Sequence, residues 1–450
     1  MTETTICAIS TPPGTGGIAT ARISGPEAIA ICDTVWRGKA LSSAASHTAH
    51  LGTVYDPASG QELDTAVALI YRAPRSFTGE DTVELSVHGS RWVQRELISL
   101  LIRRGAQLAE PGEFTRRALL NGRLDLAEAE AVGDMIAASS RAAQRIALSH
   151  LKGHYSRRLA QLREQLLELS ALVELELDFS EEDVEFADRE KLLALAEEIL
   201  RQVTALADSF ARGAAIKEGI PVAIVGATNA GKSTLLNRML GEDKALVSDI
   251  HGTTRDSIED TLEINGTLYR LIDTAGLRQT SDPIENLGIE RTRALAASAE
   301  IILWVIDPND PERIDETWAA IPRGAAVIAV VNKADTGAPT PPLPADVTDI
   351  LRLSALSDPD LSALTALIDR HGSASELAPE LTVTNERHYQ ALLRASESIA
   401  AAIRGLRDAL PGDLLAQDLR ETAAHLAAIT SPLTTPALLS HIFSHFCIGK

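Results

Sequence analysis

The stretch Gly226-Ala-Thr-Asn-Ala-Gly-Lys-Ser233 decides the fold of the middle of this chain, and it directly follows the apolar run Val222-Ala-Ile-Val225. It fits the phosphate-binding pattern Gly-x-x-x-x-Gly-Lys-Ser/Thr, placed between an expected strand and an expected helix. Glycines allow successive backbone N–H groups to surround a phosphate, and a helix N-terminus adds partial positive charge. We therefore expect Lys232 to reach the terminal phosphates of a nucleotide and Ser233 to bind Mg²⁺.

The composition limits the class of protein. The 450 residues predict two or three domains, because a single core does not serve so long a chain. Acidic residues outnumber basic ones by 62 to 42, and such a surface repels nucleic acid and membranes on average. Cys7, Cys32 and Cys447 show neither a disulfide framework nor zinc-ligand spacing, which is typical of a reducing compartment. No segment approaches the roughly 18 apolar residues of a membrane span, so we expect a soluble, cytoplasmic protein.

Four ranges differ in their sequence pattern and predict the domain organisation. Residues 1–118 alternate β-type runs, turn signals and two helical stretches, which indicates an α+β domain. Residues 119–216 are rich in Ala, Leu, Glu and Arg at helical spacing, and this helical pattern returns over residues 377–450. Residues 217–376 alternate strands and helices around the phosphate loop, as in a doubly wound parallel sheet. We expect this α/β domain to be inserted into one helical domain.

Two segments after the phosphate loop have the character of nucleotide-sensing switches. Gly252-Thr-Thr-Arg-Asp256 supplies Thr254, which we expect to contact Mg²⁺ and the γ-phosphate. In Asp273-Thr-Ala-Gly276, Asp273 would hold the metal through water and the N–H of Gly276 would contact the γ-phosphate. These segments occur in the order that a Ras-like GTPase requires.

Two further segments predict recognition of the base. In Asn332-Lys-Ala-Asp335, the carboxylate of Asp335 can accept hydrogen bonds from N1–H and the exocyclic amine of guanine, which adenine cannot reproduce. The stem of Lys333 would pack along the base. Ser354-Ala-Leu356 is a candidate for the loop that covers the guanine. Five motifs in this order predict a protein that binds GTP rather than ATP.

Hydrolysis needs a different explanation from that of Ras-type enzymes. Their water-positioning Gln corresponds here to Leu277, which can neither form a hydrogen bond nor transfer a proton. Either hydrolysis is slow or another group replaces the Gln. The nearby carboxylates are Asp282, Glu285 and Glu290, and each taken alone is better explained as a solvated surface charge.

Beyond these motifs, the chain resembles the MnmE family of tRNA uridine-modification GTPases over essentially its full length. The segments that carry the resemblance are Thr11-Pro-Pro-Gly14, Arg22-Ile-Ser-Gly25, Ser76-Phe-Thr-Gly-Glu-Asp81, Pro111-Gly-Glu-Phe114, Leu120-Asn-Gly-Arg-Leu-Asp-Leu126 and Phe446-Cys-Ile-Gly-Lys450. The chain departs from the family pattern at Thr15, where Arg is common, at Thr228, where Pro is usual, and at Leu356, where a basic residue is commoner.

The resemblance implies a fold and two small-molecule sites. Its N-terminal α+β domain would bind a tetrahydrofolate derivative, in the 5,10-methylene or 5-formyl form, and drive homodimerisation. The Ras-like GTPase domain, inserted into the helical domain, would hold K⁺ and Mg²⁺ beside GTP, with Glu285 orienting the attacking water. The implied folate contacts are Arg22, Glu84, Arg123 and Lys450. The implied K⁺ ligands are Asn229, Ser248, Ile250 and Thr253. With the motifs, the predicted GTP contacts are Asn229, Ala230, Gly231, Lys232, Ser233, Thr234, Ser248, Asp249, Ile250, His251, Gly252, Thr253, Thr254, Asp273, Thr274, Ala275, Gly276, Asn332, Lys333, Asp335, Ser354, Ala355 and Leu356.

The resemblance also implies a reaction and a partner. An aminomethyl or carboxymethylaminomethyl group would be added to C5 of the wobble uridine, position 34, of certain tRNAs, with a flavoprotein of the MnmG type as partner and FAD on that partner alone. Cys447 lies in the matching C-terminal motif and is a candidate nucleophile or acid/base, with a partly buried free thiol as the alternative.

Two other classes of function remain as alternatives from the sequence. A switch protein of the Era or Der kind would bind ribosomal RNA without chemistry, but it would need a basic RNA-binding module after the GTPase domain, and the acidic C-terminal helices lack one. A folate-dependent aminomethyltransferase acting on protein would have no place for the GTPase insertion. Direct contact with tRNA is undecided, because the cations of residues 141–158 fit a solvated helix face better than a patch.

Overall fold

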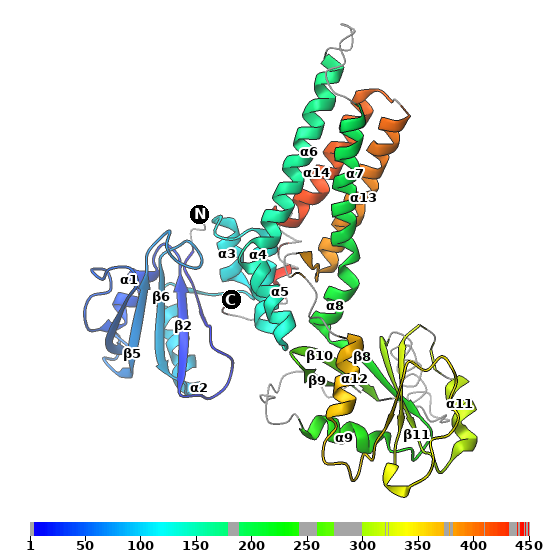
Figure 1. Ribbon diagram of the computed structural model, residues 1–450. Helices are drawn as coiled ribbons and strands as arrows, with labels where there is room; N and C mark the ends of the chain where they lie inside the picture. The colour runs from blue at the N-terminus through cyan, green and yellow to red at the C-terminus, as the bar shows by residue number, and fades with distance from the viewer. Residues whose placement is uncertain are drawn as a thin grey trace, which may run out of the picture. The chain divides into compact units, whose positions relative to one another are not determined.

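The computed structural model describes residues 4–178, 189–242, 259–273, 299–319, 321–322, 324–372, 378, 381–408, 410–431, 439, 442–444, 446 and 449 (Figure 1). The chain divides into two compact units, which are described one at a time. The first comprises Met1–Ile136, Leu148–Leu200 and Arg394–Lys450, and the second comprises Ala137–Ala147 and Arg201–Leu393. No described helix is long and apolar enough to cross a membrane.

The first unit begins with a seven-stranded sheet in the order β3-β4-β5-β6-β2-β1-β7 (Figure 1). Its strands are β1 (Ile6–Ile9), β2 (Ile18–Ser24), β3 (Trp36–Arg37), β4 (Thr48–Tyr55), β5 (Glu62–Tyr71), β6 (Thr82–His88) and β7 (Gln107–Leu108). Neighbouring strands are antiparallel, except that β7 lies parallel to β1. Two helices, α1 (Ala28–Thr34) and α2 (Arg91–Arg103), pack on this sheet. The sheet and its helices confirm the expected N-terminal α+β fold.

Side chains alternate between the two faces of the sheet along each strand. One face is covered by α1 and α2, whereas the other is covered at β1 by Phe114 and is open at β4 and β5. In β6, Val83, Leu85 and Val87 are buried in the same core as α1 and α2. The opposite face of neighbouring strands exposes apolar side chains: Leu51 is 74% exposed, and its cross-strand neighbour Val67 is 37% exposed. An open face with exposed apolar side chains is a feature of surfaces that bind a partner.

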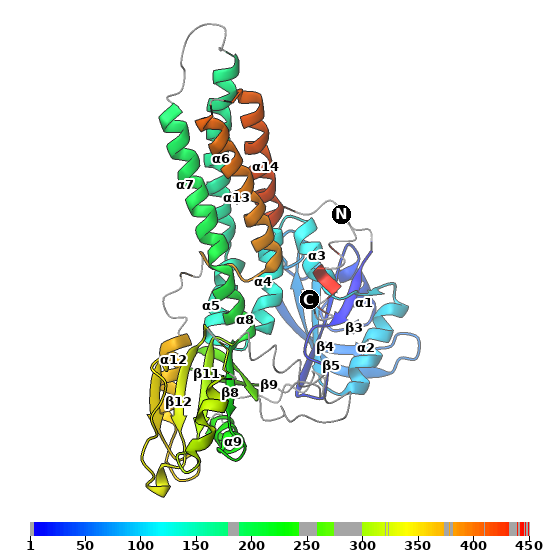
Figure 2. The same ribbon diagram turned by 90° about the vertical axis from the view of Figure 1, so that its right-hand side faces the viewer.

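Long helices form the rest of the first unit. The helices α3 (Glu113–Leu120), α4 (Leu126–Ala137), α6 (His154–Asp178) and α14 (Gly412–Thr430) belong to it, and α5 (Arg141–Leu151), α7 (Arg189–Asp208) and α13 (Glu386–Arg407) each continue into the second unit. Leu159, Leu162 and Leu166 of α6 are fully buried, which confirms the apolar face expected from their spacing. Figure 2 shows α6 and α14 as long neighbouring helices.

The C-terminal segment returns to the N-terminal part of the same unit. Phe443 joins a core with side chains of α3 and α4, and a Cβ on Gly112 would lie 2.8 Å from the Cβ of Phe443. Further on, a Cβ on Gly449 would overlap the carbonyl oxygen of Ile9, at the end of β1. Gly449 therefore lies against the first strand of the sheet.

The second unit contains a six-stranded sheet in the order β13-β12-β11-β8-β10-β9 (Figure 1). Its strands are β8 (Ile220–Gly226), β9 (Glu259–Ile264), β10 (Thr267–Asp273), β11 (Ile301–Ile306), β12 (Ala326–Val331) and β13 (Asp349–Arg352). Only β9 is antiparallel to its neighbour. The described helices around it are α8 (Phe210–Glu218), α9 (Lys232–Glu242), α11 (Ile314–Ala319) and α12 (Ser362–Gly372), with short 3₁₀ turns η2 (Pro311–Arg313) and η3 (Ala334–Thr336).

Two hydrophobic cores cover the two faces of this sheet. Leu303 and Val305 of β11 face one core, whereas Ile302, Trp304 and Ile306 face the other. A parallel strand that is buried on both faces reads as a continuous apolar run, as β11 does. The doubly wound parallel sheet predicted from the sequence is confirmed. The limits of the predicted domains stay predictions.

Candidate functional site

The phosphate loop connects β8 to α9 at the centre of the six-stranded sheet. Asn229 has a φ of +64° and Gly231 a φ of +99°, which is the left-handed region that side chains rarely adopt. A Cβ on Gly226 would overlap the carbonyl oxygen of Val305 in β11. The glycine at the first position of the motif is therefore required by the close approach of the neighbouring strand.

Lys232 begins α9 and turns back into the loop. Its side chain is nearly buried, and its Nζ donates hydrogen bonds of 2.8 Å to the carbonyl oxygens of Gly226 and Ala227. Asn229 and Ser233 are exposed. A cation held inside the loop, at a helix N-terminus, gives this position the positive potential that phosphate binding needs.

Asn332 joins three of the predicted motifs through one buried side chain. Its Nδ2 donates to the carbonyl oxygen of Ala230 in the phosphate loop at 2.8 Å, and its Oδ1 accepts from the N–H of Ala355 at 2.8 Å. A Cβ on Gly231 would overlap Asn332 Nδ2, so the second glycine of the loop makes room for this bridge. The phosphate loop, the segment after β12 and the loop at 354–356 thus meet at one edge of the sheet.

The base-side residues lie next to this bridge. Asp335 is exposed, and Lys333 has a left-handed backbone with a φ of +55°. The N–H of Ser354 donates to the carboxylate of Asp358 at 2.7 Å, which fixes the backbone of the expected guanine-covering loop. Leu356, in the same loop, is 81% exposed.

Asp307 is a residue of this edge that the motifs did not identify. It follows β11 directly, and its carboxylate pairs with the ammonium of Lys333 and accepts hydrogen bonds from Asn309. Burial alone would raise the pKa of Asp307, but the hydrogen bonds from Lys333 and Asn309 and the charge of Lys333 outweigh it and lower that pKa. Its position after a buried strand, where functional side chains of parallel sheets gather, was the available sequence signal.

Many of the predicted residues lie outside the described part of the chain, and their roles stay predictions. Asp273 is described as the last residue of β10, paired in register with Ile224 of β8. The residues outside are Ser248, Asp249, Ile250, His251, Gly252, Thr253, Thr254, Thr274, Ala275, Gly276, Leu277, Asp282, Glu285, Glu290, Cys447 and Lys450.

The first unit brings two of the implied folate contacts together. Arg22 of β2 and Glu84 of β6 are cross-strand partners, and Nε and Nη2 of Arg22 both lie 2.8 Å from Glu84 Oε1. Both side chains are more than four-fifths buried. Arg123 lies beside the same region, because a Cβ on Gly79 would be 3.1 Å from its Cγ.

The two described cysteines, Cys7 and Cys32, are buried, and this environment suits a structural role. Burial raises the pKa of the Cys7 thiol to about 12, and burial, followed by the nearby Cys7 and Asp33, raises that of Cys32. A buried thiol that stays protonated is a poor nucleophile. Burial therefore makes Cys7 and Cys32 unsuited to a catalytic role.

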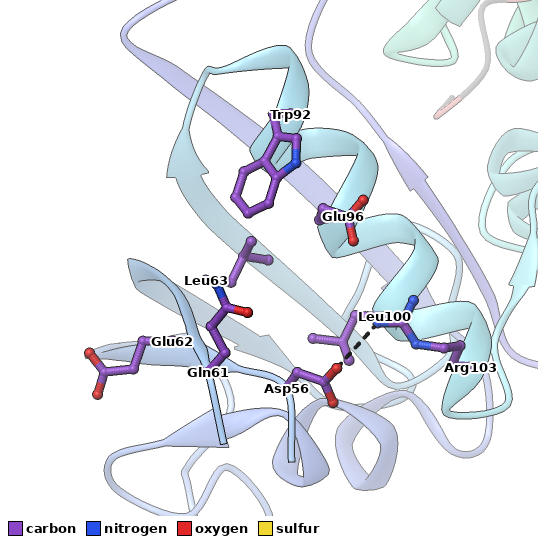
Figure 3. Close-up of a pocket in the computed structure, with 8 residues that line it drawn as sticks. All are labelled: Asp56, Gln61, Glu62, Leu63, Trp92, Glu96, Leu100 and Arg103. Atoms are coloured by element: carbon purple, nitrogen blue, oxygen red, sulfur yellow. Dashed lines mark ion pairs between the residues drawn. The ribbon is translucent and has the colours of Figure 1, made fainter. Parts of the chain in front are cut away.

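A small pocket lies between α2 and the β4–β5 turn of the first unit (Figure 3). Its carboxylates are already paired: Asp56 with Arg103 at 3.6 Å, Glu62 with Arg37 at 2.7 Å and Glu96 with Arg95 at 3.8 Å. It contains none of the predicted site residues. Among the described residues, no group of three or more His, Cys, Asp or Glu side chains has a metal-binding arrangement.

The fold and the edge around Asn332 together define a class of protein. A sheet with one antiparallel strand, a phosphate loop after its central strand β8, and Asn-Lys-x-Asp after β12 are the features of a Ras-like GTPase domain.

The comparisons with known proteins identify the family. The sequence matches the description "GTP-binding protein TrmE N-terminus" over residues 5–123 and "MnmE helical domain" over residues 126–447. It is 48% identical over 460 residues to the tRNA modification GTPase MnmE of Parabacteroides distasonis, covering 99% of this chain and 100% of that protein. The corresponding protein of Bacteroides thetaiotaomicron is 45% identical over 469 residues, with both chains fully covered. The chain therefore belongs to the MnmE family of tRNA modification GTPases, and it is a GTP hydrolase.

Solved structures add a more distant likeness. The crystal structure of a variant of Aquifex aeolicus Era bound to GDP·AlF4⁻ matches 40% of this chain and 66% of that chain, at 28% identity and a TM-score of 0.28. The family match, which spans the whole chain, removes the Era-type switch and the protein-directed aminomethyltransferase as alternatives.

Proposed function

We propose that this chain hydrolyses GTP in a potassium-dependent manner and, with an MnmG-type flavoprotein, modifies C5 of the wobble uridine at position 34 of certain tRNAs. The product would carry an aminomethyl or carboxymethylaminomethyl group built from a tetrahydrofolate one-carbon unit. The observation that carries this proposal is the end-to-end match to relatives named tRNA modification GTPase MnmE. We also propose a cytoplasmic location and the domain limits 1–118, 119–216, 217–376 and 377–450.

A reconstituted reaction tests the proposal. The purified chain and flavoprotein would be incubated with unmodified tRNA, GTP, K⁺, methylenetetrahydrofolate and either ammonium or glycine, whose nitrogen the two products contain. We expect the modified uridine in the nucleoside digest, and its loss when GTP is omitted. A digest without modified uridine under the complete conditions would contradict the proposal.

Selection of guanine would rest on Asp335. Its exposed carboxylate follows β12 next to Asn332, which links it to the phosphate loop. A carboxylate in this place accepts from the two N–H groups of guanine, whereas adenine offers an acceptor at N1. Lys333 is held beside it by the pair with Asp307, and we assign to its stem the packing along the base.

The donor set of the phosphate loop fits the proposed metal ions. Ser233, with an exposed hydroxyl at the start of α9, would hold Mg²⁺ together with Thr254. Asn229, whose amide is exposed beside it, offers the oxygen donor that K⁺ prefers, and Ser248, Ile250 and Thr253 would complete the set. The added positive charge would offset the charge that develops between the phosphates.

Potassium dependence has a direct test. GTP turnover is measured in equal concentrations of KCl and NaCl, for the wild type, for Asn229→Ala and for Thr228→Ala, an exposed neighbour that serves as the control. We expect faster turnover in KCl for the wild type and the control, and no difference between the salts for Asn229→Ala. Equal rates in both salts for the wild type would contradict the potassium site.

The Arg22–Glu84 pair fits the proposed folate. Two N–H groups of Arg22 share Oε1 of Glu84, and within the described residues Oε2 of Glu84 accepts no hydrogen bond. That free oxygen suits the donor edge of a pterin ring. Arg123, which is exposed nearby, and Lys450 would bind the glutamate tail, and the placement of Gly449 against Ile9 supports the proximity of the C-terminus.

The open face of the seven-stranded sheet supports a homodimer. Ile18, Leu51 and Val67 expose apolar surface on strands of this sheet. Burying such residues against a second copy is favourable in proportion to the area removed from water. Sedimentation of Leu51→Glu against the wild type tests this: we expect the variant to shift toward monomer, and an unchanged dimer would exclude this face.

Two residues are assigned the reacting chemistry. Glu285 would orient the water that attacks the γ-phosphate, in place of the Gln that is missing at Leu277. Cys447 would act as nucleophile or acid/base in the uridine reaction. A Glu285→Ala variant that hydrolyses GTP at the normal rate, or a Cys447→Ser variant that modifies tRNA normally, would remove the respective assignment.

A further inference from the structure

Two aromatic rings flank the guanidinium of Arg22. The Cζ of Arg22 lies 5.4 Å from the centre of the Phe77 ring and 5.6 Å from that of Phe114. Both distances are within the range in which a cation is attracted to an aromatic face. The guanidinium therefore lies beside both rings while it pairs with Glu84.

The two rings differ in exposure. Phe114 is fully buried, whereas Phe77 is 36% exposed. An exposed phenylalanine beside a nearly buried ion pair costs solvation free energy unless something covers it. The Phe114 ring is therefore enclosed by the protein, whereas part of the Phe77 ring is accessible to a ligand.

The segment that carries Phe77 is rigidly attached to the domain. Thr78 is buried and exchanges a hydrogen bond of 2.7 Å with Ser24, which follows Arg22 on β2, and Glu80 accepts from Ser24 at 2.8 Å. The amide of Asn121 donates to the carbonyl oxygen of Thr78 at 2.8 Å. Before Phe77, the hydroxyl of Ser76 donates to the carbonyl oxygen of Glu80 at 2.6 Å. A loop with hydrogen bonds on both sides of Phe77 presents this ring in a fixed place, as a binding site requires.

We propose that Phe77 is a specificity-determining residue of the folate site: one part of its ring holds Arg22, and its exposed part contacts the fused ring system of the one-carbon carrier. This rests on the proposed folate binding at Arg22 and Glu84. A flat heteroaromatic ring whose donor edge contacts Glu84 Oε2 would also stack on Phe77. A non-aromatic anion of the same charge would gain nothing from this stacking.

Titration calorimetry with 5-formyltetrahydrofolate on the full-length protein tests this inference. We expect Phe77→Leu to weaken binding about tenfold and Phe77→Tyr, which keeps the ring, to stay within about twofold of wild type. Trp92→Leu, which removes a half-exposed aromatic side chain on α2 outside the site, is the matched control and should bind normally. GTP turnover and the unfolding temperature of the Trp92→Leu control should equal those of wild type.

A double-mutant comparison separates ligand contact from mere support of Arg22. In an Arg22→Lys background, which removes the flat guanidinium, we expect Phe77→Leu to cost a further loss of several-fold. No further loss in that background, or wild-type affinity of Phe77→Leu alone, overturns the inference while leaving folate binding intact. A wild-type protein that binds no folate overturns the proposed folate site itself, and the inference with it.

Discussion

Two regions of the molecule are built in different ways. One is the sheet edge around Lys232, Asn332 and Asp335 in the second unit, called here the GTP-binding edge, and the other is the Arg22–Glu84 pair of the first unit. At the GTP-binding edge, side chains hold backbone: Lys232 binds two carbonyl oxygens and Asn332 joins the backbones of Ala230 and Ala355. In the Arg22–Glu84 pair, two side chains 62 residues apart meet because their strands are neighbours in the sheet. The GTP-binding edge is therefore marked by short sequence motifs, whereas no local motif marks the Arg22–Glu84 pair.

The largest expected effect comes from a change at Asp335, where the guanine base is proposed to bind. Replacing Asp335 by Asn puts a donor where we propose that the carboxylate faces the N–H groups of guanine, and two charge-assisted hydrogen bonds would be lost. We expect GTP affinity to fall at least about a hundredfold, affinity for xanthosine triphosphate to rise, and folate affinity to stay unchanged. Fluorescent-nucleotide titration measures this.

The control for this change is Asp315→Asn, which removes an exposed carboxylate of α11 in the same unit. It should bind GTP like the wild type. Equal GTP affinity of Asp335→Asn and the control would show that Asp335 does not read the base.

The next effect removes the bridge between motifs. Asn332→Ala leaves the carbonyl oxygen of Ala230 and the N–H of Ala355 without their partner in a buried place, at a cost of about 1–3 kcal/mol for each group. We expect GTP affinity to fall about thirtyfold and the unfolding temperature to fall with it. If Asn332→Ala bound GTP normally, the bridge would be incidental to the site.

An intermediate effect is expected from a change in the Arg22–Glu84 pair. Glu84→Gln keeps the shape of the side chain but removes the charge that pairs with Arg22 and that would accept from the proposed pterin. Loss of one charge-assisted hydrogen bond predicts about tenfold weaker folate binding, with unchanged GTP turnover. A folate titration and a GTP turnover assay on the same variant check these two expectations. A matching loss of GTP turnover would contradict the independence of the two sites.

The smallest effect concerns the pair of Asp307 and Lys333. Because the pKa of Asp307 is lowered in the folded protein, its stabilisation is fully present above the unfolded value of about 3.9 and is lost as pH falls through the folded value. We therefore expect Asp307→Asn to lower stability by about 1 kcal/mol at pH 7 and to have a smaller effect at an acidic pH below the folded pKa of Asp307. Thermal unfolding at both pH values measures the difference, and a pH-independent effect would contradict the role of the charge.

The contrast between the two sites also explains what the sequence alone could predict. The spacing of Gly226, Gly231 and Lys232 follows from how a backbone surrounds phosphate, so motif and sheet could be predicted before the structure. The position of Asp307 beside Lys333 depends on the strand order of the sheet, with β11 next to β12, and no motif contains it. The antiparallel pairing of β9 is likewise a property of the whole sheet.

The N-terminal site was open to prediction only through the family. Arg22 and Glu84 have no recognisable spacing, and their contact follows from the register of β2 on β6. The aromatic flanks of Arg22 come from two further segments, the loop at Phe77 and the start of α3 at Phe114. Long-range pairing of this kind is not encoded in local periodicity.

Nucleoside analysis of tRNA tests most directly the central claim, that one chain uses both sites to modify tRNA. Cells that lack this protein would be complemented with the wild type, Asp335→Asn or Glu84→Gln, and the wobble uridines quantified. We predict that the modified uridine disappears without the protein, returns with the wild type, and is strongly reduced with either variant. Unaltered wobble uridines in cells that lack the protein would contradict the claim.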